Sequence, residues 1–170
     1  MVGIAFLALP LSSFAATDGS LGLTSTGTAD LEVEIDELML ISGMADLNFG
    51  TWTGSGDLNQ NENICVYTNQ ASGNYTVTAT GDGAGSAFTL TDGSNTLPYN
   101  VYFNDVSGMA GEVALTATTA NTAQGGAHTT SQTCGGGNNA NYHVEIEDTA
   151  LAAVPSGTYS GTLTIVVEPR

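Results

Sequence analysis

The 170-residue chain contains no lysine, and its only arginine is the last residue, Arg170. Against this single cation stand 17 Asp and Glu residues, so the formal net charge is −16 at pH 7. A surface without cations cannot neutralise phosphates, which makes nucleic acid and anionic membranes poor partners. The same lack excludes a P-loop, a Schiff-base lysine and an arginine clamp.

Charged residues are scarce overall, at 11% of the chain, whereas 41% of the residues are hydrophobic. This composition argues against charge-driven disorder, and the chain length is typical of one folded domain. The polar positions are filled mainly by Thr, Ser and Asn, and the chain holds 22 Gly. Such a composition favours strands that are joined by tight turns.

Long hydrophobic runs are absent beyond the first residues, so we expect no stable membrane span. The run from Val2 to Phe14 has the length of a signal-peptide core, and Ser13 and Ala15 supply the small residues before a cleavage site. It lacks the usual positive start, which leaves open an upstream initiator, a weak signal or a retained segment. We predict residues 1–16 as a signal peptide and the protein as secreted.

Only two cysteines occur, Cys65 and Cys134. Their spacing is not that of a zinc site, and His128 and His143 do not complete one. In an oxidising compartment we expect one disulfide between the two cysteines. Closing a loop of about 70 residues would stabilise the fold by roughly 4 kcal/mol in the chain-entropy model.

Reactive side chains are also few, so we expect no catalytic residues, no metal and no cofactor. His143 belongs to no nucleophile motif, and we expect it at the surface or edge of a strand. Asp82, Asp92 and Asp105 lie in or beside turn signals, and we interpret them as turn formers before calcium ligands.

Alternation of apolar and polar residues with a period of two recurs along the chain, and helical periodicity is lacking. Turn signals rich in Gly, Asp and Asn separate these segments. We therefore predict an all-β antiparallel sandwich, with a long loop at 118–139. The expected strands are 29–41, 46–53, 62–68, 74–80, 87–91, 97–103, 112–117, 141–147 and 158–167.

The segment before residue 37 alternates most clearly. Its odd positions include Ala29, Leu31, Val33 and Ile35, and carboxylates fill the even positions 30–36. One face of such a strand is buried and the other is exposed to solvent. The segment is either the first strand of a self-contained sandwich or a donor strand that enters a neighbouring subunit.

Four motifs then occur in order along the chain. They are DLNFGT at 46–51, ICVYT at 64–68 with YTV at 75–77, YNVYFN at 99–104, and PSGTYSGTLTIVV at 155–167. Together they resemble the spore coat protein U-like subunits, which are the pilins of the archaic chaperone-usher pili. The resemblance covers residues 28–168.

The resemblance implies an incomplete immunoglobulin-like sandwich that a donor strand from a neighbouring subunit completes. In that family a periplasmic chaperone first lends a strand, and at the outer-membrane usher the next subunit's N-terminal extension replaces it. The match places this extension at 17–36 and the sandwich domain at 37–170. The matching donor residues are Ala29, Leu31, Val33 and Ile35, and the matching residues of the acceptor groove are Tyr159, Leu163, Ile165 and Val167.

The function that follows is that of a structural subunit in an extracellular filament, a fimbrium that serves adhesion or biofilm formation. Its partners would be further copies of the chain, with the chaperone and the usher acting during assembly. The alternative is a self-complete secreted module that binds sugar or calcium. In that alternative, residues 27–36 would pair with a sheet of their own chain.

Overall fold

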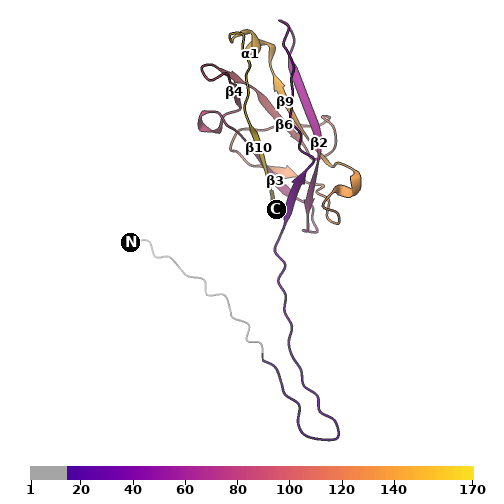
Figure 1. Cartoon of the computed structure of the whole chain (residues 1–170). Coiled ribbons are helices and arrows are strands. Elements are labelled where there is room, and N and C mark those ends of the chain that lie inside the picture. Colours follow the sequence, from indigo (N-terminus) through magenta and orange to yellow (C-terminus); the bar gives the residue numbers. More distant parts are fainter. Residues whose placement is uncertain (1–14) are drawn as a thin grey trace, which may run out of the picture. The chain divides into compact units, whose positions relative to one another are not determined.

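Figure 1 shows the computed structural model of the chain, which describes residues 15–170. The chain divides into two units, Met1–Asp36 and Glu37–Arg170. In the first unit, Thr17 and Thr28 exchange two backbone hydrogen bonds of 2.9 Å. The predicted signal peptide lies outside the described residues except for its last two.

The larger unit is built from antiparallel β-sheets, which confirms the predicted fold class. Its first sheet has five strands in the order β1-β2-β9-β6-β7, and all pairings within it are antiparallel. The strands are Met39–Ser42 (β1), Leu58–Thr68 (β2), Ala140–Ile146 (β9), Asn100–Asn104 (β6) and Val113–Ala114 (β7).

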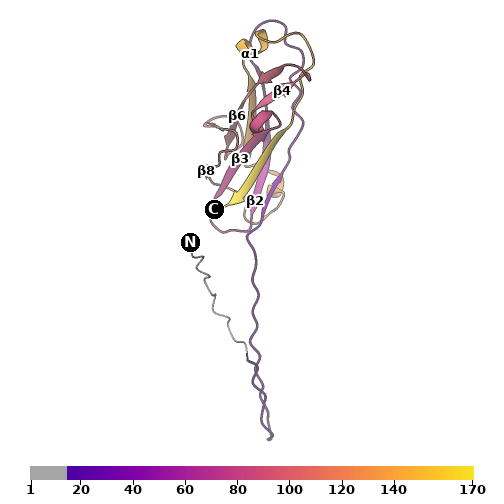
Figure 2. The same cartoon turned by 90° about the vertical axis from the view of Figure 1, so that its left-hand side faces the viewer.

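The second sheet has the order β10-β3-β8, and Figure 2 shows β10 beside β3. Its strands are Leu163–Pro169 (β10), Tyr75–Gly81 (β3) and Asn121–Gln124 (β8), and a separate pair consists of Thr89–Thr91 (β4) and Thr96–Pro98 (β5). The helices are short: the 3₁₀ turns η1 (Ala84–Ser86) and η2 (Cys134–Gly136), and α1 (Asp148–Ala152). None of the helices in residues 15–170 has the length and apolar character needed to cross a membrane.

Alternate side chains of the strands form one hydrophobic core. Tyr142, Val144 and Ile146 of β9 are buried in it, as is Tyr75 of β3. The ring of Tyr75 meets that of Phe103 edge to face, with the ring centroids 6.3 Å apart. The apolar residues that recur at every second position of the sequence are therefore the ones whose side chains pack in the core.

Cys65 and Cys134 form the predicted disulfide, which ties β2 to η2. η2 lies in the segment 118–139, which the sequence predicts as a long loop and which also contains β8. The Asn139 side chain donates to the carbonyl of Val66 at 2.9 Å and to that of Gly126 at 2.8 Å. The segment is thus fastened to β2 by a covalent bond and by hydrogen bonds.

Several predicted strand limits are wrong. Residues 29–38 belong to no strand, 46–53 form no hydrogen-bonded strand, and the last strand begins at Leu163 instead of 158. The predicted strand 97–103 is divided between β5 and β6. Apolar alternation is present in all these segments, but a strand also needs a neighbour for its backbone, and the alternation does not show whether one exists.

The prediction for His143 is also wrong, because the residue is only 7% exposed and lies on β9, inside the five-stranded sheet. Its Nδ1 atom is 3.0 Å from Oε1 of Glu112, and its Nε2 atom is 2.9 Å from Oδ1 of Asn59. The ring also stacks on that of Tyr102, at a centroid distance of 5.1 Å. Side chains from neighbouring strands therefore cover this polar face of the sheet.

Candidate functional site

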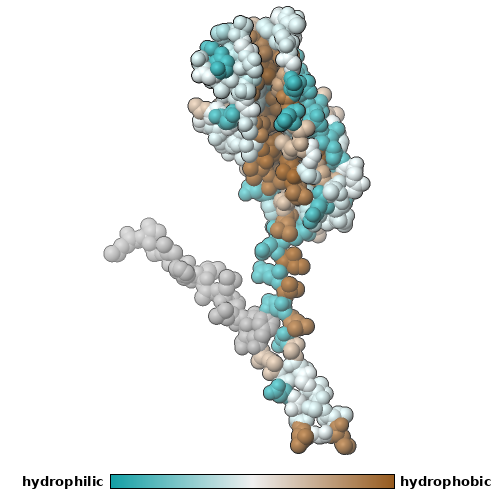
Figure 3. All heavy atoms as spheres, in the orientation of Figure 1, coloured by the Kyte–Doolittle hydropathy of each residue, from teal (hydrophilic) through white to brown (hydrophobic). Residues whose placement is uncertain are grey.

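The larger unit carries an apolar groove with two walls. We call residues 44–52 the first wall and residues 155–163 the second wall, since both line the groove. Figure 3 shows apolar side chains gathered in a band along this unit, with polar residues on either side. The cavity volume is about 900 Å³, near the upper end of the range of about 300–1,000 Å³ that is usual for ligand pockets.

The first wall is extended chain without a strand partner. At Gly43 the backbone has φ +83° and leaves β2, and a Cβ atom there would lie 3.7 Å from Cα of Ile64. From residue 44 to residue 56, no backbone-to-backbone hydrogen bond is formed with any described residue. The wall therefore presents backbone donors and acceptors that a further strand could satisfy.

Side chains hold the first wall in place. The Tyr142 hydroxyl donates to the carbonyl of Ala45 at 2.6 Å, and the Ala45 N–H donates back to the same hydroxyl at 3.4 Å. At the other end, Nε1 of Trp52 donates to the carbonyl of Gly56 at 3.1 Å. Leu47 and Phe49 are half-buried against the core, so the wall is anchored at alternate positions.

The second wall leads into β10, an edge strand that pairs with β3 along one side and has no strand partner among residues 15–170 along the other. Before β10 begins, Ser160 and Thr91 exchange two backbone hydrogen bonds of 3.0 and 2.9 Å. The N–H of Thr162 donates to Oδ2 of Asp82 at 2.9 Å. Each wall has nine residues, so at about 3.3 Å per residue the groove would fit one extended strand roughly 30 Å long.

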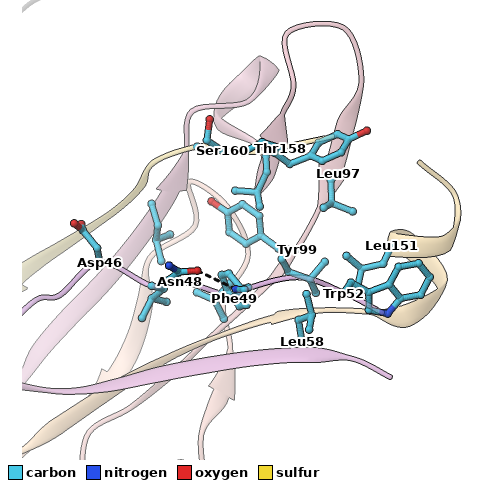
Figure 4. Close-up of a pocket in the computed structure, with 18 of the residues that line it drawn as sticks. Asp46, Asn48, Phe49, Trp52, Leu58, Leu97, Tyr99, Leu151, Thr158 and Ser160 are labelled. Carbon is cyan, nitrogen blue, oxygen red and sulfur yellow. Dashed lines mark hydrogen bonds between the residues drawn. The ribbon is translucent and has the colours of Figure 1, made fainter. Parts of the chain in front are cut away.

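The floor of the groove consists of core side chains from the five-stranded sheet, from the region of the β4-β5 pair and from the α1 region. Figure 4 shows Phe49, Trp52 and Leu58 below Leu97 and Thr158, with Tyr99 and Leu151 between the walls. The residues of the floor are Leu58, Leu90, Leu97, Tyr99, Tyr142, Val144, Ile146, Leu151 and Val154. Such a lining favours apolar side chains of a ligand over polar ones.

Carboxylates lie beside the groove on both sides, and their charges help to raise the pKa values of its tyrosines. Burial, followed by the charges of Glu62 and Asp46, raises the pKa of Tyr142. Burial, followed by the charge of Asp82, raises the pKa of Tyr99 to about 12. The Tyr99 hydroxyl is also buried without a hydrogen-bond partner among the described residues.

A third tyrosine of the groove, Tyr159, has a pKa raised by desolvation and by the charge of Asp92. Hydrogen bonds from the Asn95 side chain and from the N–H groups of Asn95 and Ser94 lower the pKa of Asp92 itself to about 2. Asp92 is therefore ionised at neutral pH.

The residues predicted for the groove fall into two pairs. Tyr159 and Leu163 line it, whereas Ile165 is buried in the core and Val167 is half-buried against it, outside the groove lining. Of the first wall, the sequence indicates only Trp52, which follows the motif at 46–51 and could either plug the core or cover the groove. The sequence pattern that marks the first wall is the alternation of Leu47 and Phe49 with polar residues. The same alternation occurs in an ordinary strand, so it does not by itself indicate a groove wall.

The residues predicted as donors lie in the other unit. Leu31, Val33 and Ile35 are 95%, 82% and 76% exposed, and Ala29 is exposed as well. Three large apolar side chains are thus presented to solvent on one face of an extended segment. Exposed apolar side chains in such a row are typical of a surface that binds another molecule.

No protein-family model matches the chain, and no curated protein does. Among solved structures, the chain is similar to one from a chaperone–tip adhesin complex described as vital for synergistic activation of CFA/I fimbriae biogenesis, with 16% identity and a TM-score of 0.51. It is also similar to a chain of the CsuC–CsuE chaperone–tip adhesion subunit pre-assembly complex from archaic chaperone-usher Csu pili of Acinetobacter baumannii, with 20% identity and a TM-score of 0.41.

Both matches cover 79% of this chain, but only 42% and 40% of the respective solved chains. The chain thus spans less than half the length of the structures that it matches. At this identity the likeness concerns the fold. The narrower resemblance to the spore coat protein U-like subunits stays a prediction.

Proposed function

We propose that the protein is a structural subunit of an extracellular, pilus-like filament that assembles by donor-strand exchange. In this proposal residues 27–36, which we call the tail segment, enter the groove of a second copy. The observation that carries the proposal is a groove whose two walls have no strand between them, in a chain that also presents an extended segment with an exposed apolar face.

The dimensions and chemistry of the two parts fit. The groove would accept about nine extended residues, and Gly27 to Ile35 is a stretch of nine with Ala29, Leu31 and Val33 on the same face as Ile35. Burying the three large side chains would stabilise the joint by roughly 5–9 kcal/mol, at about 1.5–3 kcal/mol each. Backbone hydrogen bonds to both walls would add about 1 kcal/mol each.

The geometry of exchange favours a filament over a closed dimer. The donor residues and the groove belong to different units of one copy, so each joint leaves one copy with a free groove and the other with a free tail. Such head-to-tail contacts continue without closing unless the rotation between copies forms a ring. A self-complete sugar- or calcium-binding module would leave its apolar groove exposed to water.

An open apolar groove is an aggregation hazard before the next copy arrives. We therefore propose that a periplasmic chaperone occupies it first and that an outer-membrane usher then directs the exchange. The similarity in fold to a chain from a fimbrial chaperone–tip adhesin complex supports this route. The filament would lie on the cell surface and serve adhesion or biofilm formation.

The proposal is tested by electrophoresis of the assembled protein in sodium dodecyl sulfate without heating. Joints held by an inserted strand should survive and give a ladder of oligomers, which boiling reduces to single copies. Val33→Asp should abolish the ladder, because it would place a charge in the apolar groove.

Val106→Asp is the matched control, because Val106 is also exposed, at 53% against 82% for Val33, and lies outside the groove and the tail segment. It should leave the ladder intact. If filaments form and Val33→Asp assembles as well as the control, the tail segment is not the donor.

A further inference from the structure

Both sides of the groove are acidic. Asp46 belongs to the first wall, and its charge, with that of Glu62, acts on Tyr142 in the floor. On the opposite side, Oδ2 of Asp82 accepts the N–H of Thr162, which belongs to the second wall. The charge of Asp92 contributes to the raised pKa of Tyr159, which lies in the same wall. A strand in the groove would therefore have two carboxylates near it on each side, Asp46 and Glu62 on one and Asp82 and Asp92 on the other.

No cation balances these charges in the described part of the chain. The single arginine, Arg170, uses its guanidinium to donate to the carbonyl of Thr122 in β8. In the sheet, β3 separates β8 from β10, so this charge is held away from the second wall. His128 and His143 are not among the residues that line the groove.

The tail segment does not match this electrostatic environment. Its outward positions carry Asp30, Glu32, Glu34 and Asp36, which would lie at the mouth of the groove beside the carboxylates of both walls. The inward face of the tail segment thus fits the groove while its outward face is repelled. Repulsion between the carboxylates of the tail segment and those of the groove would weaken binding and slow association. Both effects diminish as salt screens the charges.

We infer that the groove is suited to a partner strand, supplied by another protein, with apolar inward side chains and lysine or arginine outward side chains. The inference rests on the proposed function, because it assumes that the groove accepts a strand. Charge complementarity distinguishes the two occupants: the cationic strand has the advantage at low ionic strength and loses it as the ionic strength rises.

The test uses three synthetic peptides of residues 27–36 with identical inward side chains. One is native, one is neutral (Asp30→Asn, Glu32→Gln, Glu34→Gln, Asp36→Asn) and one is cationic (Asp30→Lys, Glu32→Lys, Glu34→Lys, Asp36→Lys). The receptor is the full chain with Val33→Asp, whose own tail segment does not compete. Binding is measured by fluorescence anisotropy at about 10 mM and about 1 M salt, where the Debye lengths are roughly 30 Å and 3 Å.

At low salt the cationic peptide should bind at least ~10-fold more tightly than the native one, with the neutral peptide between them. At high salt the difference should fall below about threefold. Asp46→Asn with Asp82→Asn in the receptor should reduce the low-salt difference. Glu168→Gln, on β10 but outside the groove lining, is the control and should leave the difference nearly unchanged.

Equal binding of the three peptides at low salt would overturn this inference and leave the strand-accepting groove in place. A preference that persists at high salt would also overturn it, because its cause would not be charge. If none of the peptides binds at either salt concentration, the proposed function fails together with the inference.

Discussion

Adding the tail segment as a free peptide should stabilise a single copy of the protein. The full chain with Val33→Asp serves as the receptor, since the aspartate keeps its own tail out of an apolar groove. The added peptide has the native sequence of residues 27–36. A ligand that binds only the folded state raises the free energy of unfolding, by about 2.7 kcal/mol at a concentration 100 times the Kd.

The structure gives this prediction a measurable size. The larger unit, Glu37–Arg170, lies between the size classes for which 1 kcal/mol shifts Tm by about 4–8 °C and about 2–4 °C. The expected rise in Tm is therefore about 10 °C. The only tryptophan, Trp52, lies in the first wall and is half-buried, so an inserted strand should also shift its fluorescence to shorter wavelength.

Differential scanning calorimetry measures the rise in Tm, and a peptide with Val33→Asp is the control. Its one altered side chain would place a carboxylate in the groove, and it should leave Tm within about 1 °C of the receptor alone. A native peptide that raises Tm no more than this control, at a concentration that saturates the response, would refute the idea that the groove lacks a strand.

Three further predictions concern the folded body. Tyr142→Phe removes the hydroxyl that bonds Ala45 and should lower the free energy of unfolding in urea by about 1–2 kcal/mol. Tyr67→Phe, whose hydroxyl makes no hydrogen bond recorded within residues 15–170, should change it by less than about 0.5 kcal/mol. Reducing the Cys65–Cys134 disulfide should cost about 4 kcal/mol in the same assay, and an unchanged urea midpoint with dithiothreitol would contradict this. Because burial and Asp82 raise the pKa of Tyr99 to about 12, the folded state keeps this proton longer than the unfolded chain; the contribution is complete below pH 10 and is lost as pH rises towards 12, by at most about 2–3 kcal/mol, and Tyr99→Phe should flatten this part of the pH profile.

The fold class could be predicted because the period of two and the turn signals are local properties. With only two cysteines in the chain, the disulfide followed from the oxidising compartment. His143 shows the limit of this reasoning. Its alternation with Tyr142 correctly places it on the other face of the sheet, but Asn59 and Glu112, which cover it, are 84 and 31 residues away. No local pattern indicates such partners.

The site could be predicted in part for the same reason. The alternation identifies the apolar face of the tail segment. The groove residues are implied only by the family resemblance, and of these Tyr159 and Leu163 line the groove whereas Ile165 is part of the core. Leu47 and Phe49 alternate like strand residues, yet they belong to a wall without a backbone partner. A side chain's polarity says which face it prefers, but not whether the neighbouring backbone is occupied.

Composition and periodicity therefore establish an acidic, disulfide-linked β-protein with an alternating N-terminal segment, since each of these properties belongs to single residues or to near neighbours. The location of the open edge is a property of the folded chain. β10 pairs with β3, and β1 pairs with β2 only as far as Ser42. Hydrogen bonds between strands join residues that are distant in sequence, so only their arrangement in space reveals which edges are left without a partner.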